Sequence, residues 1–349
     1  MVLDVSGIPG EVAVGQTTVT FTPTNWATPQ TITVSGIDDL IIDGDQSGDV
    51  SISVSQDSDP AFRDLENQVV HVTNQDDDVA GLTIVETNGT RVSETGSVDT
   101  FTVRLSRGPL GDVELSVVSQ DLDEAAVDTD SLTFTQENWD EPQVVRVMGI
   151  DDNVVDGDRT AEIVLSVLPT SHSSYVGLPS ESVEVVTEDD DIAAFVVTEP
   201  AAAVDESGTT TTFEVRLDRE PLTNVFVDVA SQDLSEADVS PGQLTFTSTN
   251  WNQPQTVTIL GLDDFVVDGA QTSSITVSVG AGSDAAFANV PEQSVDVVTE
   301  DDDFAGFSIG GIEDPMTVSE DGTTIRTIMA VLDADPTTGA VLQLSLIHI

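Results

Sequence analysis

The chain has 349 residues, and its 64 aspartates and glutamates against 9 basic residues give a formal net charge of -55. This imbalance excludes a nucleic-acid-binding protein, which needs a basic surface to displace counterions, and argues against binding to anionic membranes. Hydrophobic residues still make up 38% of the chain, so it can build folded cores. Cysteine is absent and no run of about 18 apolar residues occurs, which excludes disulfides and a transmembrane helix.

The sequence repeats with a period of about 112 residues. Trp26, Trp139 and Trp251 lie 113 and 112 residues apart, within the phrases FTPTNWATPQ, FTQENWDEPQ and FTSTNWNQPQ. Aspartate pairs and triplets recur in step with them, which is typical of a tandem array. In chain order we expect a partial repeat at 1–78 that lacks its first strands, complete repeats at 79–191 and 192–303, and a truncated repeat at 304–349.

The last six residues, 344–349, have the sequence LSLIHI and resemble the translation of a sequencing adaptor. The alternative is a genuine strand, because residues 341–344 partly alternate between apolar and polar side chains. The functional interpretation therefore excludes these residues. The incomplete repeats at both ends lead us to expect that the chain is a piece of a longer protein.

Short, β-branched and alternating runs predict seven strands in the third repeat. In chain order they cover 194–197, 210–217, 224–230, 243–247, 255–260, 272–279 and 294–298. A period of two implies one buried and one exposed face per strand, as in an antiparallel sandwich. The predicted fold class is therefore all-β, with tandem immunoglobulin-like antiparallel β-sandwiches of about 112 residues each.

Acidic residues concentrate at one predicted end of each sandwich. If consecutive strands alternate in direction, the loops after the first, third and fifth strands lie at the same end as the last residue of the seventh. Twelve acids and no basic residue of the third repeat fall there, against four acids at the other end. We call this end the acidic pole.

Such crowding is costly, because two unit charges about 4 Å apart repel by about 4 kcal/mol at an effective dielectric constant near 20. Carboxylates without nearby histidine or cysteine suit Ca²⁺, which takes about 6–8 oxygen ligands in irregular geometry. A solvated acidic surface is the alternative. Recurrence of the whole pattern in two complete repeats favours calcium.

Four short motifs resemble the Calx-beta family, the immunoglobulin-like calcium modules of sodium/calcium exchangers that also occur in bacterial surface proteins. They are VSE or VDE after the first strand, SQD after the third, GIDD or GLDD followed by DG after the fifth, and the closing DDD. The resemblance covers the chain up to the tail and implies calcium ligands at these four places. In the second repeat they are Glu94, Asp121, Asp151, Asp152, Asp156, Asp189, Asp190 and Asp191. In the third repeat they are Glu206, Asp233, Asp263, Asp264, Asp268, Asp301, Asp302 and Asp303.

The chain departs from the family pattern in two respects. Gly157 and Gly269 stand where the family often has further acids, which bears on the number of ions per repeat. The first repeat has Ile8 near the expected aspartate after the third strand, so we expect it to bind calcium weakly or not at all. In the family the triplet lies where one repeat passes to the next, so the resemblance implies that calcium stiffens this joint.

Catalysis finds little support in the sequence. His71 and His172 stand at non-equivalent positions and His348 lies in the tail, so no repeated nucleophile and base are present. Glycosidase chemistry needs two carboxylates across a sugar, but the tryptophans fall at the opposite pole, where core packing is favoured over carbohydrate binding. Residues 151–155 also lack the spacing of an EF-hand loop. We therefore predict that the chain is not an enzyme.

These patterns predict a calcium-binding structural and adhesive stalk segment of a large extracellular or cell-surface bacterial protein. Its expected partners are calcium ions, the neighbouring repeats and a surface or matrix ligand bound through other domains; nucleic acid and direct membrane insertion are not expected. Two alternatives stay open: an accessory, non-catalytic segment of a secreted enzyme, and a metal-free acidic spacer suited to a salty exterior.

Overall fold

A computed structural model describes residues 1–311, 316–336 and 339–341. The fold is all-β, as predicted, and nearly all strand pairs are antiparallel. Helical structure within this part of the chain consists of two 3-10 turns, Pro60–Phe62 and Ala285–Phe287. The tail at 344–349 lies outside the described residues, so the choice between adaptor and strand stays open.

Contacts divide the chain into two compact units. The first contains Met1–Asp152 and Asp158–Glu188, and the second contains Asn153–Gly157 with the described residues from Asp189 onward. The short segment Asn153–Gly157 thus packs with the repeat that follows it.

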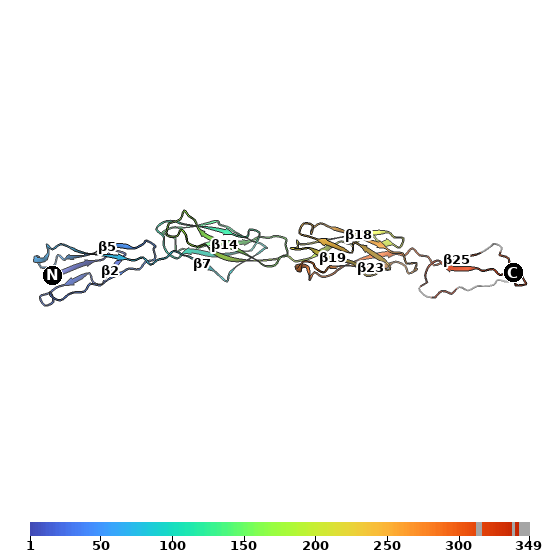
Figure 1. Cartoon of the computed structure of the whole chain (residues 1–349), viewed down its shortest axis with the longest axis horizontal. Helices are drawn as coiled ribbons and strands as arrows, with labels where there is room; N and C mark the ends of the chain where they lie inside the picture. The colour runs from blue at the N-terminus through green and yellow to red at the C-terminus, as the bar shows by residue number, and fades with distance from the viewer. Residues whose placement is uncertain (312–315, 337–338, 342–349) are drawn as a thin grey trace. The chain divides into compact units, whose positions relative to one another are not determined.

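The third repeat forms two sheets, from which β18, β19 and β23 are labelled in Figure 1. The first sheet has the order β16 (Phe195–Val197), β18 (Thr210–Leu217), β22 (Gln255–Gly261) and β20 (Ala237–Ser240). The second has the order β17 (Val204–Asp205), β24 (Gln293–Glu300), β23 (Gln271–Val279), β19 (Val225–Ser231) and β21 (Gln243–Phe246). All seven predicted strands are present, with bounds that agree to within two residues.

Two strands of this repeat were not predicted. β17 has only two residues, too few for an alternating pattern, and it runs parallel to β24. β20 pairs with β22 and carries a single fully buried side chain, that of Ala237. Both strands border the acidic pole, so their pairing decides where the adjacent acids lie: Glu206 directly follows β17, and Glu236 directly precedes β20.

One face of each long strand contributes to the core of the third repeat, as the alternating pattern predicts. Phe213, Val227 and Ile275 are at most 1% exposed. Fully burying one such side chain stabilises the fold by about 1.5–3 kcal/mol. Phe246 and Phe287 are buried in the same cluster, so the sandwich has a continuous apolar centre that positions the loops at its ends.

The second repeat has the same two-sheet arrangement. One sheet contains β11 (Ala125–Val127), β13 (Gln143–Gly149), β9 (Val98–Leu105) and β7 (Leu82–Glu86). The other contains β12 (Ser131–Phe134), β10 (Val113–Ser119), β14 (Arg159–Val167), β15 (Glu181–Glu188) and β8 (Thr90–Ser93).

The first and fourth repeats have fewer strands. The first contains β3 (Thr18–Thr20), β1 (Val2–Ser6), β5 (Gln46–Val54) and β6 (Gln68–Asn74) in one sheet, and β2 (Val12–Val14) and β4 (Val34–Gly36) in another. The described part of the fourth holds β25 (Phe307–Gly310) paired with β26 (Met329–Leu332).

The repeated tryptophans do not all have the same environment. Trp139 and Trp251 are half-buried against their cores, and their carbonyls accept hydrogen bonds from the amides of Leu105 and Leu217 at 2.9 and 2.8 Å. Trp26 is 72% exposed. The expected packing role therefore holds for two of the three and is wrong for Trp26.

Candidate metal centre

The parallel pair β17–β24 brings the first and the last of the four acidic motifs of the third repeat together. Glu206 directly follows β17, and its amide donates to the carbonyl of Glu300, the last residue of β24, at 3.2 Å. The triplet begins at the next residue. The register of this short pair therefore places Glu206 beside Asp301, although 95 residues separate them in the sequence.

Carboxylate oxygens of Glu206, Asp301 and Asp303 all lie within 4.8 Å of one another. Glu206 is 2% exposed, and the two aspartates are half-buried. We call these residues the triplet trio. They come from two of the four predicted motifs.

A second group, the glutamate trio, consists of Glu206, Glu236 and Asp268, whose oxygens also lie within 4.8 Å of one another. Glu236 is 4% exposed and was not among the ligands predicted from the sequence. A detectable signal existed, because a glutamate follows the SQD aspartate by three residues in both complete repeats. Its carbonyl accepts hydrogen bonds from the Leu262 amide at 2.9 Å and the Thr299 hydroxyl at 3.3 Å, which anchor this loop to the end of β22 and to β24.

A glycine turn orients the triplet. The amide of Gly269 donates to Asp301 Oδ2 at 2.7 Å, and the Asp303 amide donates to Asp301 Oδ1 at 2.8 Å. Gly269 has a φ of 76°, in the left-handed region that side chains disfavour. An acid at this position would be strained, which explains the glycine that departs from the family pattern.

The same turn occurs in the other repeats. Gly157, with a φ of 75°, donates to Asp189 Oδ2 at 2.6 Å, and Gly44, with a φ of 76°, donates to Asp76 Oδ2 at 2.7 Å. The first aspartate of each triplet is thus held by backbone amides. These amides lower the pKa of Asp301 and of Asp76 and keep both ionised.

The pKa values of the buried carboxyls at the acidic pole of the third repeat are shifted in the opposite direction. Burial, reinforced by the charges of Asp268 and Asp264, raises the pKa of Glu236 to about 7. Burial also raises the pKa of Glu206 and of Asp303. These groups resist ionisation because they have too little compensating positive charge.

Two buried oxygens at this pole, Glu236 Oε2 and Asp303 Oδ2, have no hydrogen-bond partner among the described residues. An unsatisfied buried acceptor costs about 1–3 kcal/mol, and more if it is charged. The donor set consists of carboxylates, the hard oxygen ligands that Ca²⁺ prefers. The residues present therefore fit a calcium ion.

The remaining predicted ligands of the third repeat lie outside both trios. They are Asp233, Asp263, Asp264 and Asp302. Asp233 accepts from the Ser235 amide at 3.0 Å, and Asp264 accepts from the Val266 amide at 2.7 Å. Their charges still reach the trios: Asp264 and Asp233 raise the pKa of Glu236, and Asp263 and Asp302 raise that of Asp303.

The predicted ligands of the second repeat are divided between the compact units. Glu94, Asp121, Asp151 and Asp152 belong to the first unit, and Asp156, Asp189, Asp190 and Asp191 to the second. Glu94 is 2% exposed, and its amide donates to the Glu188 carbonyl at 3.1 Å, as Glu206 does to Glu300. Each unit thus repeats one feature of the third repeat: the first contains the Glu94–Glu188 hydrogen bond, and the second contains the Gly157–Asp189 turn.

The loop after the fifth predicted strand contacts the following repeat at all three joints. Ile41 forms a parallel bridge with Gly108, Val154 with Glu220, and Val266 with Asp335. We call these segments the hook loops. At the second joint, the Glu220 amide donates to the Asn153 carbonyl at 2.7 Å, and Val155 packs against the core of the third repeat.

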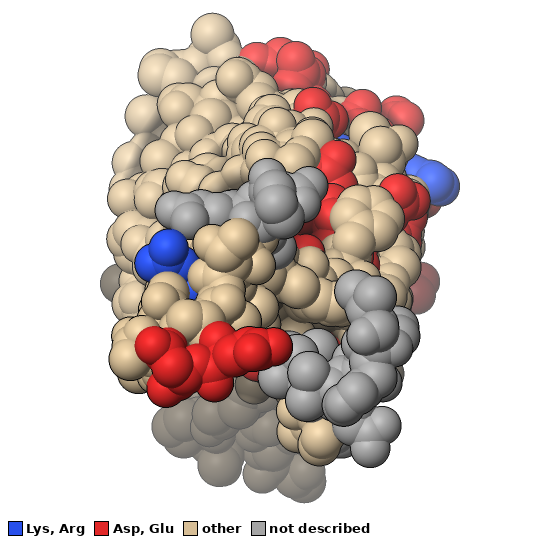
Figure 2. Space-filling model, turned by 90° about the vertical axis from the view of Figure 1, so that its right-hand side faces the viewer, with Lys and Arg blue, Asp and Glu red and all other residues tan. Residues whose placement is uncertain are grey.

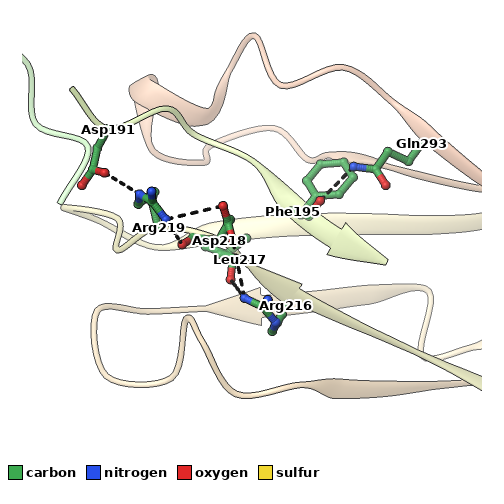
Figure 3. Close-up of polar contacts among 7 residues, drawn as sticks. All are labelled: Asp191, Phe195, Arg216, Leu217, Asp218, Arg219 and Gln293. Carbon is green, nitrogen blue, oxygen red and sulfur yellow. Dashed lines mark hydrogen bonds and ion pairs between the residues drawn. The ribbon is translucent and has the colours of Figure 1, made fainter. Parts of the chain in front are cut away.

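An ion pair accompanies two of the hook loops. Arg219 pairs with Asp191, the last member of its triplet, and Arg107 pairs with Asp78 in the same way. Figure 3 shows Arg219 between Asp191 and Asp218, and the contact between Arg219 and Asp218 measures 3.5 Å. Asp191 and Asp78 have side chains only 5% and 7% exposed, so a predicted ligand residue is also part of the joint.

Basic residues are otherwise sparse on the surface. Figure 2 shows red acidic side chains in groups, whereas blue basic side chains stand apart from one another. Among the residues that the structure describes, there is no helix that could span a membrane.

Comparison with known proteins gives little further guidance. No protein-family model and no curated protein sequence matches the chain. Among solved structures, the calcium binding domain CBD12 of CALX1.1 is 20% identical with a TM-score of 0.25, covering 57% of this chain and 79% of that one. CBD12 from CALX1.2 is 15% identical with a TM-score of 0.23, covering 62% and 99%. Mouse cadherin-23 EC22-24 is 11% identical with a TM-score of 0.33, covering 87% and 86%. Likenesses at this level do not bear on function, so the case for a metal centre depends on the geometry of the acidic poles.

Proposed function

We propose that the acidic poles bind calcium ions and that the chain is a calcium-binding structural segment of a larger extracellular protein. The triplet trio is the observation that supports this most strongly. Glu206 is buried beside two aspartates, and Asp303 Oδ2 has no partner within the described chain. Buried carboxylates without a counter-charge cost several kcal/mol each, and a divalent cation offsets that cost.

Calcium is favoured over magnesium by the ligand set. Ca²⁺ accepts many oxygens in irregular geometry, whereas Mg²⁺ demands a near-ideal octahedron and retains water ligands. Glu206, Asp301 and Asp303 would hold the ion, with Asp263, Asp264 and Asp302 close enough to add charge. The bound ion would supply positive charge that allows these carboxylates to remain ionised together.

The role we propose for the ion is mechanical. Binding would link the end of β17 to the triplet, and the triplet leads directly into the next repeat. The hook loops connect the same region to the following repeat through backbone hydrogen bonds. Calcium at the pole would therefore stiffen the joint, as expected of a stalk that holds other domains away from a surface.

We propose no catalytic role. The two histidines within the described part of the chain have other partners: His71 Nδ1 is 3.1 Å from Asp49, and His172 Nδ1 is 2.9 Å from Ser174 Oγ. An accessory position in a secreted enzyme is compatible with the same structural role. The extracellular location is a proposal that the strongly acidic composition supports, because such a surface suits a salty exterior.

Thermal unfolding of the full chain with calcium and with a chelator tests the calcium claim. A chain in which Trp26 and Trp139 are replaced by Phe retains Trp251 as the single tryptophan reporter of the third repeat. An ion at about 100 times its Kd adds about 2.7 kcal/mol per site, so the Trp251 transition should move to higher temperature.

Magnesium at equal concentration and NaCl at equal ionic strength are the controls. Replacing Asp301 and Asp303 by Asn should remove most of the calcium effect. If calcium, magnesium and NaCl stabilise the chain equally, the pole is a metal-free acidic surface and the proposal is wrong.

A further inference from the structure

One glutamate occupies the same place in the first three repeats, and it is buried in the second and third. The equivalent residues are Glu11, Glu124 and Glu236. The carbonyl of each accepts a hydrogen bond from the amide of the residue that directly follows β4, β13 or β22: Ile37 at 2.8 Å, Ile150 at 3.0 Å and Leu262 at 2.9 Å. The backbone of this position is therefore the same in each repeat, and differences around the carboxylate arise from side chains.

In the first repeat an amide satisfies this carboxylate. Asn74 Nδ2 donates to Glu11 Oε2 at 3.2 Å. The equivalent residues of the other two repeats are Thr187 and Thr299, whose hydroxyls donate instead to the backbone carbonyls of Glu124 and Glu236 at 3.2 and 3.3 Å. Neither threonine hydroxyl is thus directed to the glutamate side chain.

In the second repeat an arginine provides the counter-charge. Arg159 Nε lies 3.8 Å from Glu124 Oε1, and the Glu124 side chain is 7% exposed. The equivalent residue of the third repeat is Gln271, which is neutral and whose side-chain amide donates to the Asp268 carbonyl at 3.3 Å. The third repeat therefore lacks the positive charge that the second repeat has.

Glu236 is left with acidic neighbours. Its Oε2 atom is buried and has no partner among the described residues, and its carboxylate lies within 4.8 Å of those of Glu206 and Asp268. Resting on the calcium function proposed above, we infer that the glutamate trio binds a second divalent cation in the third repeat. Arg159 takes the place of this ion in the second repeat, and Asn74 satisfies the glutamate in the first.

Glu206 belongs to both trios, so its carboxylate joins the two ion positions. The chain thus has poles of different ion content, set by Asn74 in the first repeat, by Arg159 in the second and by the neutral Gln271 in the third. Asn74 and Arg159 carry donors to the glutamate of their own repeats, whereas the amide of Gln271 donates to the Asp268 carbonyl.

Counting bound calcium on the full chain by equilibrium dialysis tests this inference. Glu236→Gln and Gln271→Arg should each lower the number of bound ions by one, the first by removing a ligand and the second by supplying a positive charge. Arg159→Gln should raise the number by one, because Glu124 loses its counter-charge. Glu214→Gln on β18 and Gln253→Arg in the loop before β22 are matched controls and should leave the number unchanged.

Each outcome separates this inference from the function on which it rests. If the unaltered chain binds no calcium, the proposed function fails. If Asp301→Asn lowers calcium binding but Glu236→Gln and Gln271→Arg do not, the second position alone is overturned. An unchanged count for Arg159→Gln overturns the role of Arg159. Thermal unfolding in chelator checks that each variant folds, and Gln271→Arg retains the test if Glu236→Gln does not fold.

Discussion

Arg219 forms an ion pair with Asp191, so the last aspartate of one triplet contacts the loop that follows β18 of the next repeat. The equivalent pair, Arg107 with Asp78, joins the first two repeats. At the third joint the position is occupied by Ala334. The aspartates of these pairs are almost fully buried, whereas the arginines remain about one-third exposed.

Replacing Arg219 by Ala should destabilise the third repeat by about 1–3 kcal/mol, because it removes charge-assisted hydrogen bonds and leaves Asp191 buried. Urea unfolding followed through Trp251 measures the change. Arg216→Ala is the control, since Arg216 forms an exposed pair with Asp218 at 3.6 Å that is worth at most about 1 kcal/mol. Equal losses for both variants would contradict a special role for the pair at the joint.

Val155→Ala should also lower the stability of the third repeat, although residue 155 lies within the second repeat of the sequence. Its side chain packs against the core that contains Trp251, and removing buried methyl groups costs about 1 kcal/mol or more. Val118→Ala, at a position 48% exposed on β10, provides the control. A Trp251 transition that is insensitive to Val155→Ala would show that the hook loop does not support its neighbour.

Stability without calcium should depend on pH through Glu236. Its pKa rises from 4.5 to about 7 on folding, so the folded state binds the proton more tightly than the unfolded state does. The resulting stabilisation is fully present below pH 4.5, decreases as pH rises toward 7 and is absent above that. In chelator, the difference in melting temperature between Glu236→Gln and the unaltered chain should therefore grow from pH 4.5 to 7 in favour of the variant.

Calcium should reverse the effect of pH in this range, because the ion binds the deprotonated carboxylate. Calcium affinity should increase between pH 5 and about 7 and then level off. Isothermal titration calorimetry in buffers of different ionisation enthalpy would report the released proton. A calcium affinity that does not change with pH would contradict the coupling.

Gly269→Ala should weaken calcium binding and lower stability by about 1 kcal/mol, because a side chain at a φ of 76° is strained. The same strain would misalign the amide that holds Asp301. Gly242→Ala is the control, because its new Cβ would meet only the Val229 carbonyl at 3.7 Å, with no positive φ. Calcium titration and urea unfolding of both variants measure the difference, and equal calcium affinities would contradict the role of the turn.

Much of this architecture could be predicted because it is periodic. The 112-residue repeat, the alternating strands of the third repeat and the gathering of acids at one pole all follow from local spacing. The short strands β17 and β20 could not be predicted, because two to four residues carry no measurable alternation. Their existence depends on pairing with β24 and β22, which lie far away in the sequence.

The sequence by itself determined the fold class and where its negative charge gathers, since both depend on residue order within single strands and loops. Only the tertiary structure decided which acids meet. Glu236 and Asp268 come together because separate loops end at one pole, and Glu124 finds Arg159 through the same convergence. A net charge of -55 says nothing about these partners, because a counter-charge acts over a few ångströms that only the folded chain specifies.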